Sequence, residues 1–288
     1  MVTLPASGFW SIRSLRESDR SDLLSFLEQN PLINAYLISR VLDEGVAGAG
    51  DMLQVSYDGV PLVVAALGSN VVMAANREVD PELLASGIRV VGEKIITRHL
   101  PLRAIISEAD LVEILWDFVR AHYDPPTVLR LSQPVYVLDR DPESLPDLHQ
   151  LRFSELRDLE ILVPACAAMH REEVGIDPME RDAFGYRERV RELVWRRRSL
   201  IMFRERQLVF KCELSAVTPA TIQLMGVWTA PAWRRRGLAR LGMSEISGHI
   251  LREGKSVTLF VNDFNAAAIA LYESLGFRRI GQNRALIW

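Results

Sequence analysis

Two stretches in the second half of this 288-residue chain decide its fold: residues 223–239 read QLMGVWTAPAWRRRGLA, and residues 265–277 read NAAAIALYESLGF. The first stretch begins as an apolar strand, continues as a loop with three arginines and a glycine, and opens a helix with one apolar face. A glycine-containing loop at the start of a helix presents unpaired backbone N–H groups and the positive end of the helix dipole, and both favour a diphosphate. Taken alone, this pattern also fits a solvated basic loop.

The loop combines positive charge with a backbone that an anion can approach closely. Arginine side chains add charge-assisted hydrogen bonds to phosphate oxygens, and a glycine leaves room beside the main chain. The candidate diphosphate-binding residues are Arg234, Arg235, Arg236, Gly237, Leu238 and Ala239.

The second stretch gives the loop a specific meaning, because its pattern is N-x-x-A-x-x-L-Y-x-x-x-G-F. In this order, the two stretches resemble the acetyl-CoA-binding motif and the following motif of the GCN5-related N-acetyltransferase (GNAT) superfamily, over about residues 150–288. The resemblance implies an α/β (α+β three-layer) fold with a mixed twisted sheet of the GNAT type, and acetyl-CoA as acyl donor. It also implies that Val227, Trp228 and Thr229 pair with the pantetheine arm as with an extra strand, and that Asn265 contacts this arm.

The same resemblance implies that Tyr272 lies near the thioester sulfur and protonates the departing thiolate. Transfer of an acyl group to an amine needs such an acid, a polarised carbonyl and a base. The helical spacing of Tyr272 from Ala268 and Leu275 also fits a tyrosine that only fills the core. The flanking asparagine and Gly-Phe favour the catalytic role.

The base is less clearly marked, because the late positions of the central strand are Met225 and Gly226 rather than an acidic residue. Glu213 on the neighbouring strand is one candidate, although Lys211 beside it also suggests a solvated ion pair. A chain of water molecules to bulk solvent is a further alternative. Glu172 and Glu173, predicted in a loop after the first helices, are candidates for an acceptor site that attracts a cationic amine.

The chain begins the same fold twice. Residues 15–23 and 151–159 share the pattern L-R-x-S-x-x-x-D-L, with a serine predicted as the N-cap of a helix that ends or kinks at the following proline, Pro31 or Pro164. A polar, proline-punctuated linker lies between the halves. We therefore predict two tandem copies, with domains 1–145 and 146–288.

Each copy continues with a three-stranded meander and then a helix, a buried strand and a second helix. The predicted strands of the first copy are 52–57, 61–67, 71–75 and 103–107, with helices at about 81–97 and 110–122. Those of the second copy are 200–204, 208–216, 221–229 and 256–261, with helices at about 237–253 and 265–275.

The first copy lacks the features that would bind a cofactor. Its loop at residues 74–81 reads AANREVDP, without the arginine-glycine pattern, and Trp116 stands where the acid would be. An indole N–H is no useful proton donor to a thiolate. We predict a degenerate domain that forms a pseudo-dimer with the catalytic copy and shapes the acceptor cleft.

Composition excludes several classes of function. The net charge is -3, which gives no overall attraction to nucleic acid or anionic membranes. The arginine-rich segment at residues 187–198 fits a salt-bridged helix face better than a nucleic-acid site. No apolar run is long enough for a membrane span, and no signal peptide is evident, so a cytoplasmic protein is expected. Cys166 and Cys212 match no metal or redox spacing, so no metal is expected.

The sequence therefore predicts an N-acetyltransferase that moves acetyl from acetyl-CoA to a primary amine of a small molecule or protein by direct attack. The expected partners are this amine acceptor, with neither nucleic acid nor membrane. The assembly is expected to be a monomer, as an intramolecular pseudo-dimer, or a homodimer. The missing strand carboxylate also leaves open a non-catalytic regulatory protein that binds acyl-CoA.

Overall fold

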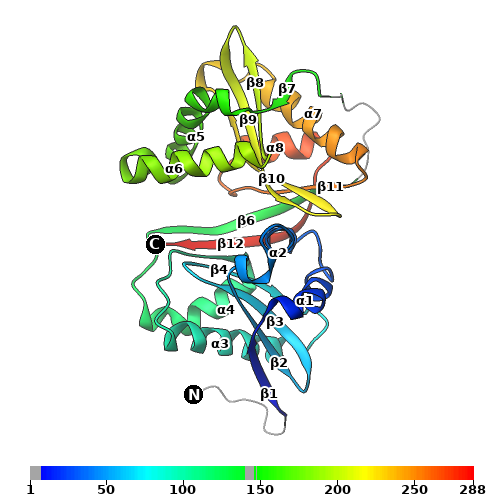
Figure 1. The fold of residues 1–288 in the computed structure, drawn as a ribbon, viewed down its shortest axis with the longest axis vertical. Coiled ribbons are helices and arrows are strands. Elements are labelled where there is room, and N and C mark those ends of the chain that lie inside the picture. The colour runs from blue at the N-terminus through cyan, green and yellow to red at the C-terminus, as the bar shows by residue number, and fades with distance from the viewer. Residues whose placement is uncertain (1–7, 140–145, 147) are drawn as a thin grey trace. The chain divides into compact units, whose positions relative to one another are not determined.

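The computed structural model, which describes residues 8–139, 146 and 148–288, divides into two units that repeat one order of elements (Figure 1). The first unit comprises Met1–Val135, Phe260–Phe264 and Ile280–Trp288, and the second comprises Tyr136–Leu259 and Asn265–Arg279. The repeat confirms the predicted tandem arrangement.

The described residues of the first copy form six strands and four α-helices, together with two short 3₁₀ helices. In chain order they are β1 (Trp10–Ser14), η1 (Glu17–Asp19), α1 (Arg20–Leu27), α2 (Ala35–Gly48), β2 (Asp51–Tyr57), β3 (Val60–Leu67), β4 (Asn70–Ala75), α3 (Pro81–Thr97), β5 (Ala104–Glu108), α4 (Ala109–Val119), η2 (Arg120–His122) and β6 (Val128–Leu138).

The second copy repeats this order. Its elements are β7 (Leu151–Phe153), η3 (Leu156–Asp158), α5 (Leu159–Val174), α6 (Pro178–Trp195), β8 (Ser199–Arg204), β9 (Gln207–Val217), β10 (Thr221–Thr229), η4 (Pro231–Trp233), α7 (Leu238–Arg252), β11 (Ser256–Phe260), α8 (Ala266–Ser274) and β12 (Arg278–Ile287).

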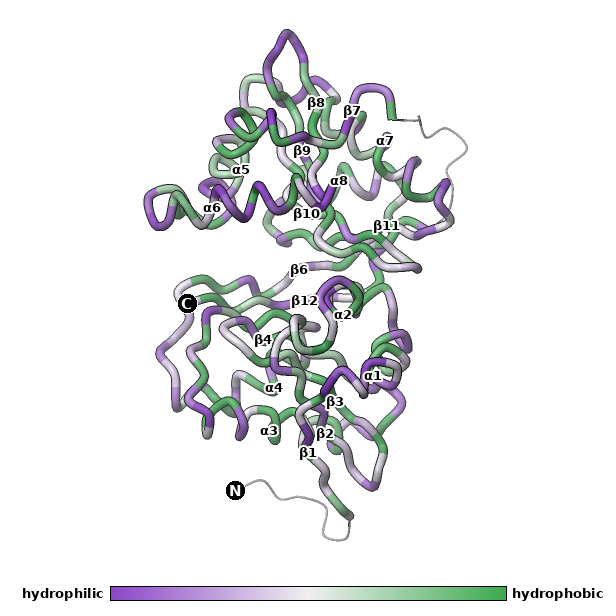
Figure 2. Tube along the Cα trace, in the orientation of Figure 1, coloured by the Kyte–Doolittle hydropathy of each residue, from purple (hydrophilic) through white to green (hydrophobic). Residues whose placement is uncertain are grey.

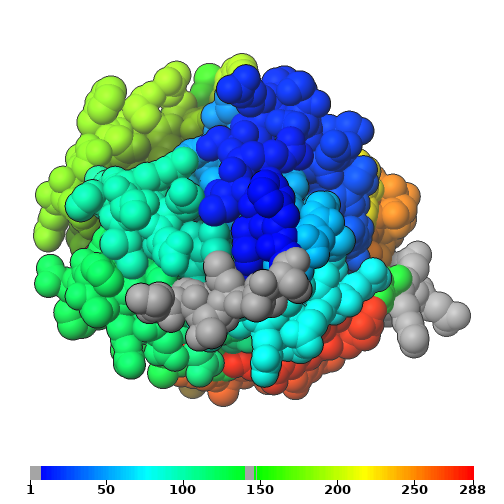
Figure 3. All heavy atoms as spheres, turned by 90° about the horizontal axis from the view of Figure 1, so that it is seen from below, coloured from blue at the N-terminus to red at the C-terminus, as the bar shows by residue number. Residues whose placement is uncertain are grey.

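In the first unit, helices cover both faces of the sheet because its strands are apolar on both sides. Val63 and Ala65 belong to the same core as residues of α3 and α4, whereas their neighbours Val64 and Ala66 belong to the core of α1 and α2. Successive strand residues face opposite sides, so this alternation produces three layers. The strand β1 pairs with β2 at the edge of the sheet and lies at the surface (Figure 3).

Both units contain a mixed sheet. In the first unit β4 is parallel to β5, and in the second unit β10 is parallel to β11, whereas the meander strands that precede them are antiparallel. In the second unit, α5 and α6 pack on β8, β9 and β10 through an apolar core. These observations confirm the predicted fold class.

Each unit also contains the end of a strand from the other sequence copy. In the first unit, β12 pairs antiparallel with β5 from Asn283 opposite Glu108 to Ile287 opposite Ala104. The end of β6, from Tyr136 onward, belongs to the second unit. The predicted domains were 1–145 and 146–288. The observed division differs because it assigns the last strand of each copy, β12 and the end of β6, by strand pairing and not by chain order.

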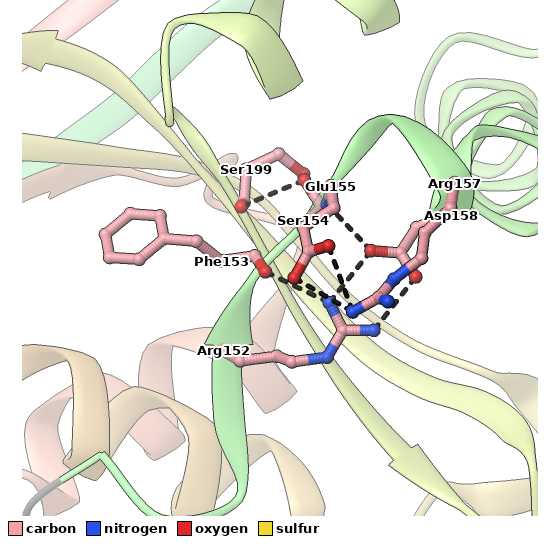
Figure 4. Close-up of polar contacts among 7 residues, drawn as sticks. All are labelled: Arg152, Phe153, Ser154, Glu155, Arg157, Asp158 and Ser199. Atoms are coloured by element: carbon pink, nitrogen blue, oxygen red, sulfur yellow. Dashed lines mark hydrogen bonds and ion pairs between the residues drawn. The ribbon is translucent and has the colours of Figure 1, made fainter.

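The opening motif of each copy repeats, but three residues away from the predicted alignment. In the second copy, Arg152 forms a bidentate ion pair with Asp158, with both N–O distances at 2.8 Å, and Asp158 accepts from the N–H of Glu155 (Figure 4). In the first copy, Asp19 makes corresponding contacts, with a single hydrogen bond from Arg13 and one from the N–H of Arg16. The predicted serine N-caps are therefore wrong. In each copy an aspartate, Asp19 or Asp158, accepts a hydrogen bond from the N–H of the residue three positions before it.

Of the two alternatives predicted at Pro164, an end or a kink of the helix, the end is wrong. The helix α5 continues through Pro164 to Val174, with a buried stripe that includes Leu162 and Cys166. The lost hydrogen bond of the proline nitrogen is a local cost, and burial of the apolar face on the sheet offsets it.

The helix α6 is largely hydrophilic (Figure 2) and carries the arginine-rich segment. Arg196 pairs with Glu192 at 2.8 Å, and Arg191 and Glu188 also form an ion pair. The salt-bridged face expected here is present. Within the described residues, no helix is long and apolar enough to cross a membrane.

Candidate active site

The strand β10 contains a bulge and an open edge. Met225 lies opposite Glu213 on β9 and Trp228 lies opposite Lys211, so two residues of β10, Gly226 and Val227, face a single residue of β9. On its other side, β10 pairs with β11 only from Thr221 to Leu224. The predicted cofactor strand Val227, Trp228 and Thr229 thus lies beyond the last pair with β11, where an extended ligand can pair with the main chain.

The helix α7 begins without a side-chain cap. Its N-cap residue is Gly237, which has φ +79° and ψ 0° and provides no side-chain oxygen for the first N–H groups. A residue with a β-carbon is strained at this φ. The exposed start of a 15-residue helix therefore presents N–H groups and a positive dipole end to solvent, as a diphosphate site requires.

The three arginines of the loop have different surroundings. Arg234 donates to the carbonyl oxygen of Thr229 at 3.0 Å and forms an ion pair with Glu172 at 2.5 Å. The guanidinium of Arg236 lies 4.8 Å from the centre of the Trp233 ring. Arg235 is exposed and has a positive φ of 60°. Arg234 is thus held by the protein itself, whereas Arg235 and Arg236 form no ion pair with a described carboxylate.

Tyr272 lies inside the second unit on α8, with 5% of its surface exposed and its ring 5.9 Å from that of Phe277. Burial raises the pKa of Tyr272, and the charges of Glu173 and Cys212 raise this pKa further. Among the side chains that the structure describes, none hydrogen-bonds the Tyr272 hydroxyl. A protonated donor is therefore held without a protein acceptor.

Asn265 serves as the N-cap of α8, because its side chain accepts a hydrogen bond from the N–H of Ala268 at 3.2 Å. This contact explains an asparagine at this position without a ligand. The predicted contact with the cofactor arm stays a prediction.

Glu213 and Lys211 form a buried ion pair rather than the solvated one that the sequence suggested. Lys211 is 0% exposed and Glu213 4% exposed, and their charged atoms are 2.5 Å apart. The thiol of Cys166 lies 3.6 Å from the same carboxylate oxygen. The alternating pattern of β9 places Lys211 and Glu213 on one face of the strand. It does not reveal that both faces of β9 are buried.

Glu172 and Glu173 lie in the last turn of α5, not in a loop as predicted. Glu172 accepts from the indole N–H of Trp228 at 3.2 Å and pairs with Arg234, so it holds the arginine-glycine loop against β10. Glu173 is the one whose charge acts on Tyr272. The structure thus separates two neighbouring carboxylates that the sequence treated alike.

The first copy differs at the corresponding positions, although β4 also pairs with β5 only at Asn70 and Val71. Its strands β3 and β4 pair without a register shift, and the N–H of Met73 donates to the hydroxyl of Ser107 at 2.7 Å. The helix α3 is capped by Asp80, whose carboxylate accepts from the N–H groups of Glu82 and Leu83. A carboxylate of the chain therefore occupies the place where a phosphate would bind in the second copy.

Sequence reasoning missed the bulge and the contacts of Glu172. A glycine inside a strand pattern often marks a bulge, so Gly226 was a usable signal. No sequence signal pointed to the contact of Glu172 with Trp228, which depends on how α5 packs. Among the described residues, no group of three or more His, Cys, Asp and Glu is placed to hold a metal ion.

Comparison with protein families identifies the segment that carries this site. Residues 213–286, from β9 into β12, match the model of a family described as FR47-like protein. No curated protein matches the chain.

Three solved structures are similar to nearly the whole chain. A protein of Drosophila is 16% identical with a TM-score of 0.65, covering 96% of this chain and 98% of its own. A GNAT-family acetyltransferase from Colwellia psychrerythraea is 11% identical with a TM-score of 0.59, covering 96% and 99%. A tandem GNAT protein from the clavulanic acid biosynthesis pathway is 12% identical with a TM-score of 0.56, covering 97% and 98%. At these identities the likeness concerns the fold.

Proposed function

We propose that this chain, a tandem protein of the GCN5-related N-acetyltransferase superfamily, transfers an acetyl group from acetyl-CoA to a primary amine of a small molecule or protein. The observation that carries the proposal is the contrast between the two copies. The second has a bulge in β10 and an uncapped start of α7, whereas the first has no bulge between β3 and β4 and its helix start is capped by Asp80.

In the proposed complex, the diphosphate of acetyl-CoA binds at the start of α7 and its pantetheine arm pairs with Val227 to Thr229. The N–H groups of the helix and the side chains of Arg235 and Arg236 supply the donors. Of the two equivalent helix starts, α7 has no side-chain cap, whereas α3 is capped by Asp80. We therefore expect one acetyl-CoA per chain.

The reaction is a direct attack. The neutral amine forms a C–N bond with the thioester carbonyl carbon, the C–S bond breaks, and the thiolate takes the proton of Tyr272, which solvent then replaces. Burial makes Tyr272 a weak acid. Burial also raises the pKa of a nearby thiol, and that of Cys212 rises to about 12. A thiolate expelled into the same surroundings is correspondingly basic, so the proton transfer is not strongly uphill.

The acceptor approaches as a cation, and we propose that Glu173 attracts its ammonium group. Its charge raises the pKa of Tyr272, and it lies in the last turn of α5 next to Glu172, which pairs with Arg234. Because Glu213 is committed to Lys211, we assign removal of the amine proton to solvent. A cytoplasmic location, and partners limited to the amine acceptor, complete the proposal.

The test combines calorimetry with an assay of thiol release. We expect the chain to bind CoA with a stoichiometry of one and to release CoA from acetyl-CoA only when an amine is added. Replacing Arg235 and Arg236 with glutamine should weaken CoA binding about 10-fold or more. Arg252→Gln, at the far end of α7, is the matched control and should leave binding unchanged.

Two results would decide against the enzyme. Tight CoA binding with background thiol release across amines and peptides would indicate the acyl-CoA-binding regulatory protein instead. A stoichiometry of two would contradict the proposed loss of the site in the first copy.

A further inference from the structure

A charged cluster lies buried directly behind the bulge of β10. The ammonium nitrogen of Lys211 is 2.5 Å from a carboxylate oxygen of Glu213 and donates to the carbonyl oxygen of Gly226 at 3.0 Å. Lys211 is fully buried, and it is among the largest side chains with no exposed surface. One ammonium thus links the carboxylate of β9 to the main chain of the bulge on β10.

Stability alone is a poor explanation for this pair. Moving two charges out of water is costly, and apolar side chains of similar volume are often at least as stabilising, so buried ion pairs are better understood as devices that select one geometry. Burial by itself lowers the pKa of Lys211, but the charge of Glu213 outweighs it and the pKa of Lys211 lies above its usual range. The ammonium therefore stays charged and keeps all its donors.

The geometry selected here is that of Gly226. Its φ is +58°, and a β-carbon at this position would lie 3.0 Å from the carboxyl carbon of Glu213 and 3.1 Å from the Lys211 nitrogen. A trans peptide is planar, and its C=O and following N–H point in opposite directions. With the Gly226 carbonyl drawn to Lys211, the N–H of Val227 points away from the ion pair.

The first copy provides an internal comparison. Its strand β3 corresponds to β9, and residues 62–67 of β3 are all apolar, so no charged pair is present there. The pairing of β3 with β4 also has no bulge. Within this chain, the buried pair and the bulge occur together or not at all.

We propose that Lys211 and Glu213 are positioning residues that hold the Gly226 carbonyl, fix the bulge of β10 and thereby aim the N–H of Val227 at the thioester end of the bound cofactor. The inference rests on the proposed acyl transfer. In it, Glu213 acts through Lys211 and removes no proton from the amine. An N–H held in advance is a donor that needs no reorganisation when negative charge develops on a carbonyl oxygen.

The experiment compares the double variant Lys211→Met/Glu213→Gln with the wild type. The double change leaves no unpaired buried charge and roughly conserves volume. We expect kcat to fall roughly 100-fold, as for a misplaced catalytic group, while the calorimetric Kd for CoA changes only a few-fold, because the diphosphate site is intact. Hydrogen exchange of the segment 225–229 should become faster without any ligand. Lys211→Arg, which keeps a charged donor, should restore part of kcat.

Two further variants guard against a trivial loss of folding. Gly226→Ala disturbs the bulge from the other side and should reproduce the fall in kcat. Glu245→Gln is the matched control, because this carboxylate on α7 is 1% exposed but contacts backbone N–H groups of residues 149–151. It should lower thermal stability without changing kcat or exchange at 225–229.

The outcomes separate this inference from the proposed function. If the wild type binds CoA but shows no turnover, the function fails, and the exchange of segment 225–229 still tests the positioning role. Wild-type kcat and wild-type exchange in a folded double variant would overturn the inference. If the double variant does not fold, the same two readouts on Gly226→Ala decide.

Discussion

A buried tyrosine works as an acid only while it holds its proton, and the surroundings of Tyr272 ensure this. Its raised pKa, caused first by burial, keeps the hydroxyl protonated well beyond the usual tyrosine range. We predict that Tyr272→Phe lowers kcat roughly 100-fold and leaves the Kd for CoA nearly unchanged. Because the folded pKa is raised, the wild type should show no loss of kcat from tyrosine ionisation up to about pH 10.

The control for this substitution is Tyr136→Phe, because the Tyr136 hydroxyl is also buried but donates to Glu273 at 3.0 Å. It should change stability more than kcat. An unchanged kcat in Tyr272→Phe would remove the acid from the mechanism. An alkaline fall in kcat that disappears in the phenylalanine variant would show that the pKa lies within the ordinary range.

The neighbouring carboxylates of α5 should differ in kinetics as they differ in contacts. Glu172→Gln weakens the hold on Arg234 and Trp228, so we predict a KM for acetyl-CoA raised by a few-fold, consistent with an exposed pair. Glu173→Gln should instead raise the KM for the amine. Steady-state kinetics with each substrate varied in turn checks both. The assignment is wrong if the two variants show the same pattern.

At this scale the sequence predicted residue types better than their surroundings. The position of Gly237 at the start of α7 was predictable, and its positive φ fits a glycine there. The burial of Lys211 was not, because alternation along β9 cannot show that both faces of a strand are covered. Local sequence also cannot show that Glu172 reaches a strand 56 residues away.

At the scale of elements, most strands and helices were predicted to within a few residues. Alternating apolar runs and turn residues mark the meanders, and Asp80 followed by Pro81 marks the start of α3. The errors occurred where a tertiary contact outweighs a local rule. The helix α5 continues through Pro164, and the turn before it is closed by Asp158 with Arg152 rather than by a serine.

The contact between α7 and residues 149–151, at the start of the second copy, should be sensitive to substitution. The carboxylate of Glu245 accepts from the N–H groups of His149, Gln150 and Leu151, the last at 2.8 Å. We predict that Glu245→Gln lowers the free energy of unfolding by about 1–3 kcal/mol, because an amide NH₂ then faces backbone donors. Urea unfolding measures this.

Glu253→Gln is the comparison for that measurement, because Glu253 lies just beyond the same helix and its side chain is 44% exposed. Its effect should stay within about 0.5 kcal/mol. Equal effects of the two substitutions would show that the buried carboxylate is not what fastens residues 149–151 to α7.

At the scale of the whole molecule, the tandem repeat was predictable and the assignment of the closing strands was not. Repeated patterns reveal that a fold occurs twice. Yet the partner of a strand depends on pairing between distant segments, and β12 is polar over most of its length, so its sequence does not indicate which unit it joins. Only the structure shows that Ile280–Trp288 belong to the first unit.

This assignment predicts that a change near the C-terminus weakens the first unit. Leu286 is 2% exposed and belongs to the core formed by α3 and α4, and the Trp288 ring lies 5.5 Å from that of Trp116. We expect Leu286→Ala to cost about 2–5 kcal/mol and to speed hydrogen exchange in β5 and α4 more than in β8 and β9. Leu286→Met, which conserves volume, should cost less than about 1.5 kcal/mol. Faster exchange confined to residues 148–279 would instead show that the closing strand stabilises the copy that encodes it.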